Sequence, residues 1–97
     1  MKPFRWNHAK NHELKVGRGI SFEEAVLAIE ADGLLDVVRH PNSGTYPNQL
    51  VSIVALDGYV NLVPFVEEPE YYFLKTIIPS RKATRNYVLR RNTDETP

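Results

Sequence analysis

Polar and apolar positions near the start of the chain follow the spacing of two amphipathic helices. Asn7 can cap a first helix that runs to about residue 16, because its side-chain oxygen can accept a bond from an amide of the first turn. Ser21 and Glu24 form a capping box at the start of a second helix, in which Glu24 reaches back to the Ser21 amide. Gly33 ends this helix. Its apolar residues share one stripe and predict a core on that side: Phe22, Ala25, Val26 and Ile29.

Farther along, apolar runs are separated by turn residues, which is the pattern of short strands joined by tight turns. Asp57-Gly58 lies between two runs and predicts a hairpin, because both central residues of the favoured turn need a positive φ. Pro64 removes one ladder donor and indicates a bulge or an edge near that point. The predicted strands are residues 34–40, 50–56, 59–66 and 71–78, and a last helix is expected over residues 81–89.

This order of two helices, four strands and one helix predicts an α+β fold. Because short turns join neighbouring strands, we expect a four-stranded antiparallel sheet with two N-terminal helices and one C-terminal helix packed on it. The 97 residues are few for two domains, so residues 1–92 are expected to form one domain. Residues 93–97 are expected to be a loose tail.

Composition excludes several functional classes. Apolar residues make up 42% and charged residues 25% of the chain, as in an ordinary folded domain. No apolar run approaches the roughly 18 residues of a membrane-spanning helix, and the polar start does not resemble a secretory leader. The absence of cysteine removes disulfides, thiolate metal sites and thiol catalysis, and it fits a reducing compartment. A cytoplasmic protein is therefore expected.

Charge is strongly segregated along the chain, although the net charge is zero. Residues 1–18 carry a net charge of +4, residues 19–74 of −8 and residues 75–93 of +6. If the two basic segments fold onto one face, that face attracts polyanions such as RNA. The alternatives are that the charges solvate separate faces, or that the basic helix pairs with the acidic middle of the chain. We expect a shared basic face that includes Lys15, Arg18, Lys75, Arg90 and Arg91.

The C-terminal basic block contains candidate catalytic residues. Arg81 and Arg85 are one helical turn apart with Lys82 beside them, and three such cations can hold phosphate oxygens. His40, at a strand end, is a candidate acid or base because a free imidazole titrates near neutral pH. An exposed histidine without a chemical role is the alternative.

Two further groups of residues have both a functional and an ordinary interpretation. His8 and His12 have the i, i+4 spacing that can bind a metal. Because the sequence shows no third ligand, two exposed histidines are the simpler interpretation, and no metal or other cofactor is expected. Aromatic side chains in strands are usually core, but some could stack on RNA bases: Tyr59, Tyr71, Tyr72 and Phe73.

Three motifs, in the same order, resemble the BrnT-type toxins of bacterial toxin–antitoxin pairs, and the resemblance covers nearly the whole chain. The motifs are Phe4-x-Trp6-Asn7-x-x-Lys10-Asn11, Gly19-Ile20-Ser21-Phe22-Glu23-Glu24-Ala25 and Ile77-Ile78-x-x-Arg81-Lys82-Ala83-Thr84. The resemblance implies a RelE-like ribonuclease fold, an RNA substrate and inhibition of translation by RNA cleavage without a metal. The RNA contacts it implies are the cations of the shared basic face: Lys15, Arg18, Lys75, Arg90 and Arg91. It also implies a cognate antitoxin with a ribbon-helix-helix DNA-binding domain, and either a homodimer or a toxin–antitoxin heterotetramer.

In that interpretation, the RNA 2′-hydroxyl attacks the adjacent phosphate. Arg81 and Arg85 would stabilise the charge that develops on the phosphoryl oxygens. The residues expected to assist them or to move protons are Lys82, Lys15, His40 and Tyr87.

The sequence departs from the family pattern at several positions. Gly17-Arg18-Gly19 stands where members have Lys-His-Gly, and members carry strand arginines where Leu50 and Thr76 stand. The alternative function is therefore a basic module of the same fold that binds RNA or a partner and cleaves weakly or not at all. A third alternative is a metal enzyme that uses His8 and His12.

Overall fold

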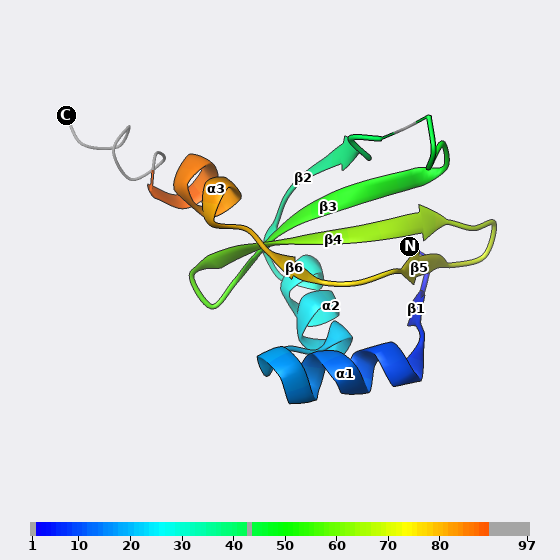
Figure 1. Ribbon diagram of the computed structural model, residues 1–97, viewed down its shortest axis with the longest axis horizontal. Coiled ribbons are helices and arrows are strands. Elements are labelled where there is room, and N and C mark those ends of the chain that lie inside the picture. Colours follow the sequence, from blue (N-terminus) through cyan, green and yellow to red (C-terminus); the bar gives the residue numbers. More distant parts are fainter. Residues whose placement is uncertain (1, 43, 90–97) are drawn as a thin grey trace.

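The computed structural model describes residues 2–42 and 44–89, which form a mixed β-sheet with helices on both of its faces (Figure 1). The α+β class predicted from the sequence is confirmed. The helices are α1 (His8–Arg18), α2 (Phe22–Glu30) and α3 (Arg81–Thr84), which continues as the π-helical turn η1 (Arg85–Leu89). The strands are β1 (Phe4–Trp6), β2 (Leu34–Arg39), β3 (Gln49–Leu56), β4 (Tyr59–Glu67), β5 (Tyr72–Leu74) and β6 (Ile78–Pro79).

The prediction of a four-stranded antiparallel sheet is wrong, because the described residues form a six-stranded mixed sheet. β1, which was not predicted, pairs in parallel with β5 and places Phe4 opposite Tyr72. The single strand expected over residues 71–78 is two short strands, β5 and β6, and both run antiparallel to β4. The order along the sheet is β1-β5-β4-β3-β2, and β6 also pairs with β4.

Pro64 lies inside the central strand β4, where a residue without an N–H is uncommon. It is buried opposite Val51, and its carbonyl accepts a 2.8 Å bond from the Lys75 amide. A residue of an antiparallel strand directs its N–H and its C=O toward the same neighbour, so the missing donor faces the segment between β5 and β6. Residues 75–77 of that segment are not in a strand. The irregularity predicted near Pro64 therefore falls in the neighbouring segment.

Local sequence signals set the limits of α1. The Asn7 side chain accepts a 3.0 Å bond from the Lys10 amide, which confirms the predicted cap. The helix continues two residues beyond the expected end, to Arg18. It stops at Gly19, whose φ of 66° is left-handed and therefore favours glycine.

α2 begins at the predicted Ser21 cap, but the second half of the capping box differs. Ser21 Oγ accepts a 3.2 Å bond from the Glu24 amide. The Glu24 carboxylate accepts a 3.1 Å bond from the Ser21 hydroxyl, rather than from the Ser21 amide as predicted. After the helix, Gly33 is closely packed against backbone, because a Cβ there would lie 2.7 Å from the carbonyl oxygens of Ala28 and Ala55.

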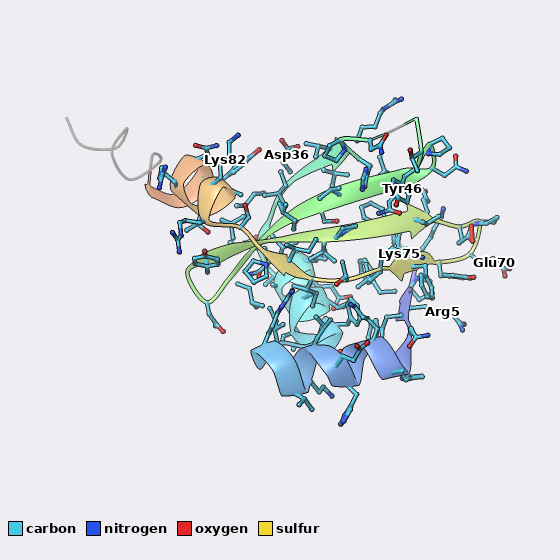
Figure 2. The ribbon with its side chains drawn as sticks, viewed as in Figure 1. Arg5, Asp36, Tyr46, Glu70, Lys75 and Lys82 are labelled. Atoms are coloured by element: carbon cyan, nitrogen blue, oxygen red, sulfur yellow. The ribbon has the colours of Figure 1, made fainter. Side chains whose placement is uncertain are left out.

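The predicted hairpin between β3 and β4 is confirmed. Asp57 and Gly58 have φ values of 54° and 77°, as a two-residue turn with two positive φ angles requires. The ladder pairs Leu56 with Tyr59 beside the turn. Because side chains alternate along each strand and project from both faces (Figure 2), this register decides which residues share a face.

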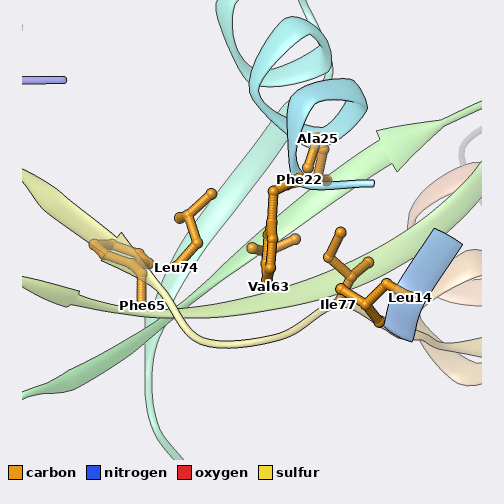
Figure 3. Close-up of a cluster of buried hydrophobic side chains, with 8 residues drawn as sticks. Leu14, Phe22, Ala25, Val63, Phe65, Leu74 and Ile77 are labelled. Carbon is orange, nitrogen blue, oxygen red and sulfur yellow. The ribbon is translucent and has the colours of Figure 1, made fainter. Parts of the chain in front are cut away.

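One face of the sheet, called the core face, lies against α1 and α2. Its strand residues pack with Leu14 of α1 and with Phe22 and Ala25 of α2, all of which are buried (Figure 3). Trp6 of β1 stacks on Phe22, with ring centroids 5.7 Å apart. The other buried residues of this main core are Val54, Val63, Phe65, Leu74 and Ile77.

The opposite face, called the second face, lies against α3. Ala83 of α3 is buried with Ile53 of β3 and Val60 of β4, and Tyr87 of η1 packs against them. Ile53 and Val60 alternate along their strands with residues of the main core, so they point to the other side of the sheet. α3 therefore lies across the sheet from α1 and α2, as Figure 1 shows.

A buried side chain joins α1 to α2. Asn11 is 5% exposed; its Oδ1 accepts a 2.8 Å bond from the Phe22 amide, and its Nδ2 donates a 2.8 Å bond to a Glu23 carboxylate oxygen. The Phe22 amide is in the first turn of α2, where amides have no acceptor within the helix. The bond from Asn11, then backbone bonding and the charge of Lys15, hold the pKa of Glu23 below its ordinary value.

Replacing Asn11 with alanine should lower the free energy of unfolding by about 1–3 kcal/mol, because the Phe22 amide is left buried without an acceptor. Chemical denaturation followed by circular dichroism measures the change. His12→Ala, at an exposed position of the same helix, is the matched control and should change the free energy by less than about 0.5 kcal/mol. Equal stability of the two variants would contradict this role of Asn11.

Candidate functional site

Two cations from distant parts of the chain lie together on the second face of the sheet. In β1, Phe4 and Trp6 pack against the main core, so Arg5 between them points to the second face. In β5, Phe73 points to that face for the same reason, and it pairs with Arg5 across the parallel ladder. The Lys75 ammonium lies 5.4 Å from the centre of the Phe73 ring.

Each of these cations lies over an aromatic ring. The Arg5 guanidinium is 5.3 Å from the centre of the Tyr71 ring, and Lys75 covers Phe73. The negative face of a ring attracts a cation within about 6 Å, by about 0.5–1 kcal/mol at an exposed site. Both rings are half-buried, whereas both cations are exposed. The rings therefore hold the cations against the sheet and leave their charges accessible to a ligand.

α3 and η1 bring further cations to the other end of this face. Ala83 buries the side of the helix that faces the sheet. Two bonds tie the helix to the start of β4: the Ser80 amide donates to the Val60 carbonyl at 2.9 Å, and the Val60 amide donates to Thr84 Oγ1 at 2.8 Å. The exposed cations of this segment are Arg81, Lys82 and Arg85.

These residues define a surface that we call the basic face: Arg5, Tyr71, Phe73, Lys75, Arg81, Lys82 and Arg85. It follows β4 from Val60, which binds the α3 segment, to Val66, which pairs with Phe73. At about 3.3 Å per residue, this stretch of strand spans roughly 20 Å. Figure 2 shows Lys82 at one end of the sheet and Lys75 and Arg5 at the other.

The expected meeting of the two basic segments holds for Arg5 but is wrong for Lys15 and Arg18. Both lie on α1, which covers the core face, whereas α3 lies on the second face. Lys15 Nζ is 3.8 Å from a Glu23 carboxylate oxygen, and the Arg18 guanidinium donates a 2.6 Å bond to the Ile77 carbonyl. These two side chains therefore contact their own chain: Lys15 reaches α2, and Arg18 reaches the segment between β5 and β6.

The structure also keeps His40 apart from the cations of α3. His40 follows β2, and its Nδ1 accepts a 3.0 Å bond from the Asn42 amide while its ring lies 4.7 Å from that of Tyr46. The residue of β2 that reaches η1 is Asp36, through Tyr87. Along the strand, His40 is about 13 Å from Asp36. Because Asp36 marks the place where β2 meets η1, His40 is too far from α3 to exchange a proton with a phosphate bound there.

Tyr87 of η1 and Asp36 of β2 form a pair on the second face of the sheet. The Tyr87 hydroxyl donates a 3.4 Å bond to an Asp36 carboxylate oxygen. Partial burial of the phenol, followed by the charge of Asp36 and this bond, raises the pKa of Tyr87 above its ordinary value. The phenol therefore keeps its proton at neutral pH and can act as a proton donor, but not as a base.

The predicted histidine pair is not part of the basic face, and two predicted RNA contacts, Arg90 and Arg91, lie outside the described residues. His8 and His12 are exposed on α1. Across residues 2–42 and 44–89, no group of three or more histidine, cysteine, aspartate or glutamate side chains could hold a metal ion. In that same part of the chain, no helix is both long and apolar enough to cross a membrane.

The sequence did not identify Arg5 and Asp36 as members of the site. The signal for Arg5 is the alternation of Phe4, Arg5 and Trp6, which places two rings on one side of a strand and a cation on the other. A three-residue strand is too short to be recognised from such a pattern. Asp36 gave no local signal, because its partner Tyr87 is distant in the sequence.

No model of a known protein family matches the chain, and no curated protein matches it. The resemblance to BrnT-type toxins therefore depends on the three motifs alone. The first two motifs meet in the structure, where Asn11 binds Phe22 and Glu23. The third begins at Ile77 in the main core and ends on α3. The RelE-like topology implied by the resemblance stays a prediction.

Asp36→Asn should lower the pKa of Tyr87 toward its ordinary value of 10.0, because the charge beside the phenol is removed. Partial burial remains, so the pKa should stay above the ordinary value. Tyrosinate absorbance against pH measures it, with a Tyr87→Phe protein subtracted to isolate this residue. An unchanged pKa would contradict the pairing of Tyr87 with Asp36.

The same shift should appear in the stability of the protein. The pKa of Tyr87 is higher in the folded state than in the unfolded state. The stabilising contribution of Tyr87 to the free energy of unfolding is therefore complete below pH 10.0 and is lost as the pH rises through the folded-state pKa. Asp36→Asn should reduce this loss.

Proposed function

We propose that the chain is a toxin-type protein that binds RNA through the basic face. The observation that carries the proposal is the presence of Arg5 and Lys75, from distant parts of the chain, on the same face as α3 and its cations. Lysine and arginine that neutralise phosphates release counterions, which favours RNA binding regardless of sequence. The rings of Tyr71 and Phe73 offer stacking surfaces to unpaired bases.

The charges of the basic face are available for a ligand of this kind. In the part of the chain that the structure describes, the ion pairs join Lys2 to Glu67 at 2.7 Å and Lys15 to Glu23 at 3.8 Å. Neither pair includes a cation of the basic face. The acidic middle of the chain, residues 19–74, therefore does not neutralise that face by direct ion pairing.

The resemblance to BrnT-type toxins supplies the biological role in this proposal. The protein would inhibit translation and would be neutralised by a cognate antitoxin that carries a ribbon-helix-helix domain. The two proteins would assemble as a heterotetramer, or the toxin would form a homodimer. An RNA substrate implies a cytoplasmic site of action.

RNA cleavage is the second candidate function, and the pair of Tyr87 with Asp36 favours it. A phosphate held by Arg81 and Arg85 would have to reach around the helical segment to this pair, because Tyr87 lies on the side of the segment that packs against the sheet. The 2′-oxygen would bond to phosphorus as the bond to the 5′-oxygen breaks. The Asp36 carboxylate would accept the 2′-hydroxyl proton, and Tyr87 would donate its proton to the 5′-oxygen. The two cations would stabilise the charge on the phosphoryl oxygens.

Lys75→Ala combined with Lys82→Ala should weaken binding of a single-stranded RNA twelve-mer. The slope of log K against log salt should also fall by about 1.4, since each phosphate contact contributes about 0.7. Fluorescence anisotropy at several salt concentrations measures both quantities. Lys10→Ala combined with Lys15→Ala removes the same charge from α1 and should leave the slope near that of the wild type. Equal losses in the two double variants would disprove the proposed face.

Arg81→Ala combined with Arg85→Ala should slow RNA cleavage by about 100-fold or more, because the developing phosphoryl charge loses its stabilising groups. Tyr87→Phe should slow cleavage while leaving RNA affinity unchanged. Gel analysis of end-labelled RNA gives the rates, and growth after induction of the gene alone or with the adjacent reading frame gives the cellular effect. Undiminished cleavage and growth inhibition by the double variant would rule out this catalytic assignment.

A further inference from the structure

A cavity of about 410 Å³ lies at the β1 edge of the sheet, at the far end of the basic face from α3. Small-molecule sites typically have volumes of about 300–1,000 Å³. The residues that line the cavity are Phe4, Arg5, Trp6, His8, Tyr71 and Phe73. It therefore combines aromatic rings, a guanidinium and an imidazole at one place.

The free edge of β1 adds main-chain polar groups next to this cavity. The Tyr72 amide donates a 2.9 Å bond to the Pro3 carbonyl, and Arg5 is opposite Phe73 in the same parallel ladder. Successive residues of a strand direct their N–H and C=O groups to opposite sides. The groups of Arg5 therefore point to β5, and those of Phe4 and Trp6 point to the free edge of β1. Both of these residues line the cavity, so it offers main-chain donors and acceptors.

The rings and the cations are placed for a ligand with a flat face and a negative charge. Tyr71 and Phe73 are half-buried, and the Arg5 guanidinium lies 5.3 Å from the centre of the Tyr71 ring. Lys75 is not among the lining residues, but its ammonium lies 5.4 Å from the centre of the Phe73 ring, which does line the cavity. A flat heterocycle can stack on such rings, and the two exposed cations can take a phosphate attached to it.

We propose that this cavity binds one unpaired nucleobase of a single-stranded RNA, with the adjoining phosphate held by Arg5 and Lys75. The proposal rests on the RNA-binding function proposed above and adds a base-binding subsite to it. The base stacks on Tyr71 or Phe73 as the cation over that ring turns to the phosphate, and the polar edge of the base bonds to the main-chain groups of β1. A hydrocarbon would leave those groups and the two cations without partners. A simple anion would not use the rings.

Nuclear magnetic resonance with mononucleotides tests the subsite on the intact chain. Adenosine and uridine 5′-monophosphates should shift the amide resonances of residues 4–8 and 71–75. They should also shift the indole N–H resonance of Trp6, which is the one tryptophan of the chain. Ribose 5-phosphate carries the same charge without a base and should shift these resonances much less. Equal shifts with ribose 5-phosphate, or shifts confined to α3, would overturn the proposal.

Ring variants give the second readout. Tyr71 precedes β5, so Tyr71→Leu removes a stacking surface without altering the ladder. It should weaken both mononucleotide binding and binding of an RNA twelve-mer by about 5- to 150-fold, the effect of losing one stacked base. Phe73→Leu should act in the same direction. Tyr59, at the β3–β4 turn, shares the face of Val63 and Phe65, so it lies on the core face and not among the stacking rings. Tyr59→Leu should therefore leave both affinities unchanged.

The outcomes separate this proposal from the RNA-binding function on which it rests. If the twelve-mer binds with a strong salt dependence and Tyr71→Leu has no effect, the subsite is wrong and the basic face stands. If mononucleotides bind in the cavity but the twelve-mer does not bind, the RNA-binding function is wrong and the cavity is a site for free nucleotides. If Tyr71→Leu weakens binding of both the mononucleotides and the twelve-mer, and Tyr59→Leu binds both as the wild type does, the subsite is supported.

Discussion

The parallel pairing of β1 with β5 is the contact on which both the main core and the basic face depend. It holds Phe4 and Trp6 against the core, where Trp6 stacks on Phe22. The same pairing turns Arg5 to the second face, opposite Phe73. A shift of one residue in this register would expose the two rings and bury the cation, so the core fixes the position of the charge.

The path of the chain after β5 determines which helices share a face. Ile77 is buried in the main core, the next residues pair with β4 as β6, and Ala83 is buried on the second face. The chain therefore passes around an edge of the sheet within a few residues. As a result, α1 and α2 pack on the core face, where Lys15 of α1 pairs with Glu23 of α2. α3 packs on the second face, which carries Arg5 and Lys75.

Local signals predicted the parts of the fold that depend on neighbours in the sequence. The Asn7 cap, the start of α2 at Ser21 and the Asp57-Gly58 turn each follow from residues a few positions apart. The α+β class followed from their order. The β1–β5 pairing could not be predicted, because it joins distant segments through a strand of three residues. For the site, the cations of α3 were predicted from the sequence. Lys15 and Arg18 were assigned to the same face as α3, because no local pattern marks the point at which the chain passes from one face of the sheet to the other.

In the proposed complex, RNA lies on the basic face, along β1, β5 and α3. Photo-crosslinking of the intact protein to a 4-thiouridine RNA, followed by mass spectrometry of the linked peptides, locates the RNA on the protein. We expect crosslinks in residues 4–8, 71–75 and 81–87, with few on α1 beyond its first turn or on α2. Crosslinks concentrated on residues 10–30 would instead place the RNA on the core face of the sheet and disprove binding on the basic face.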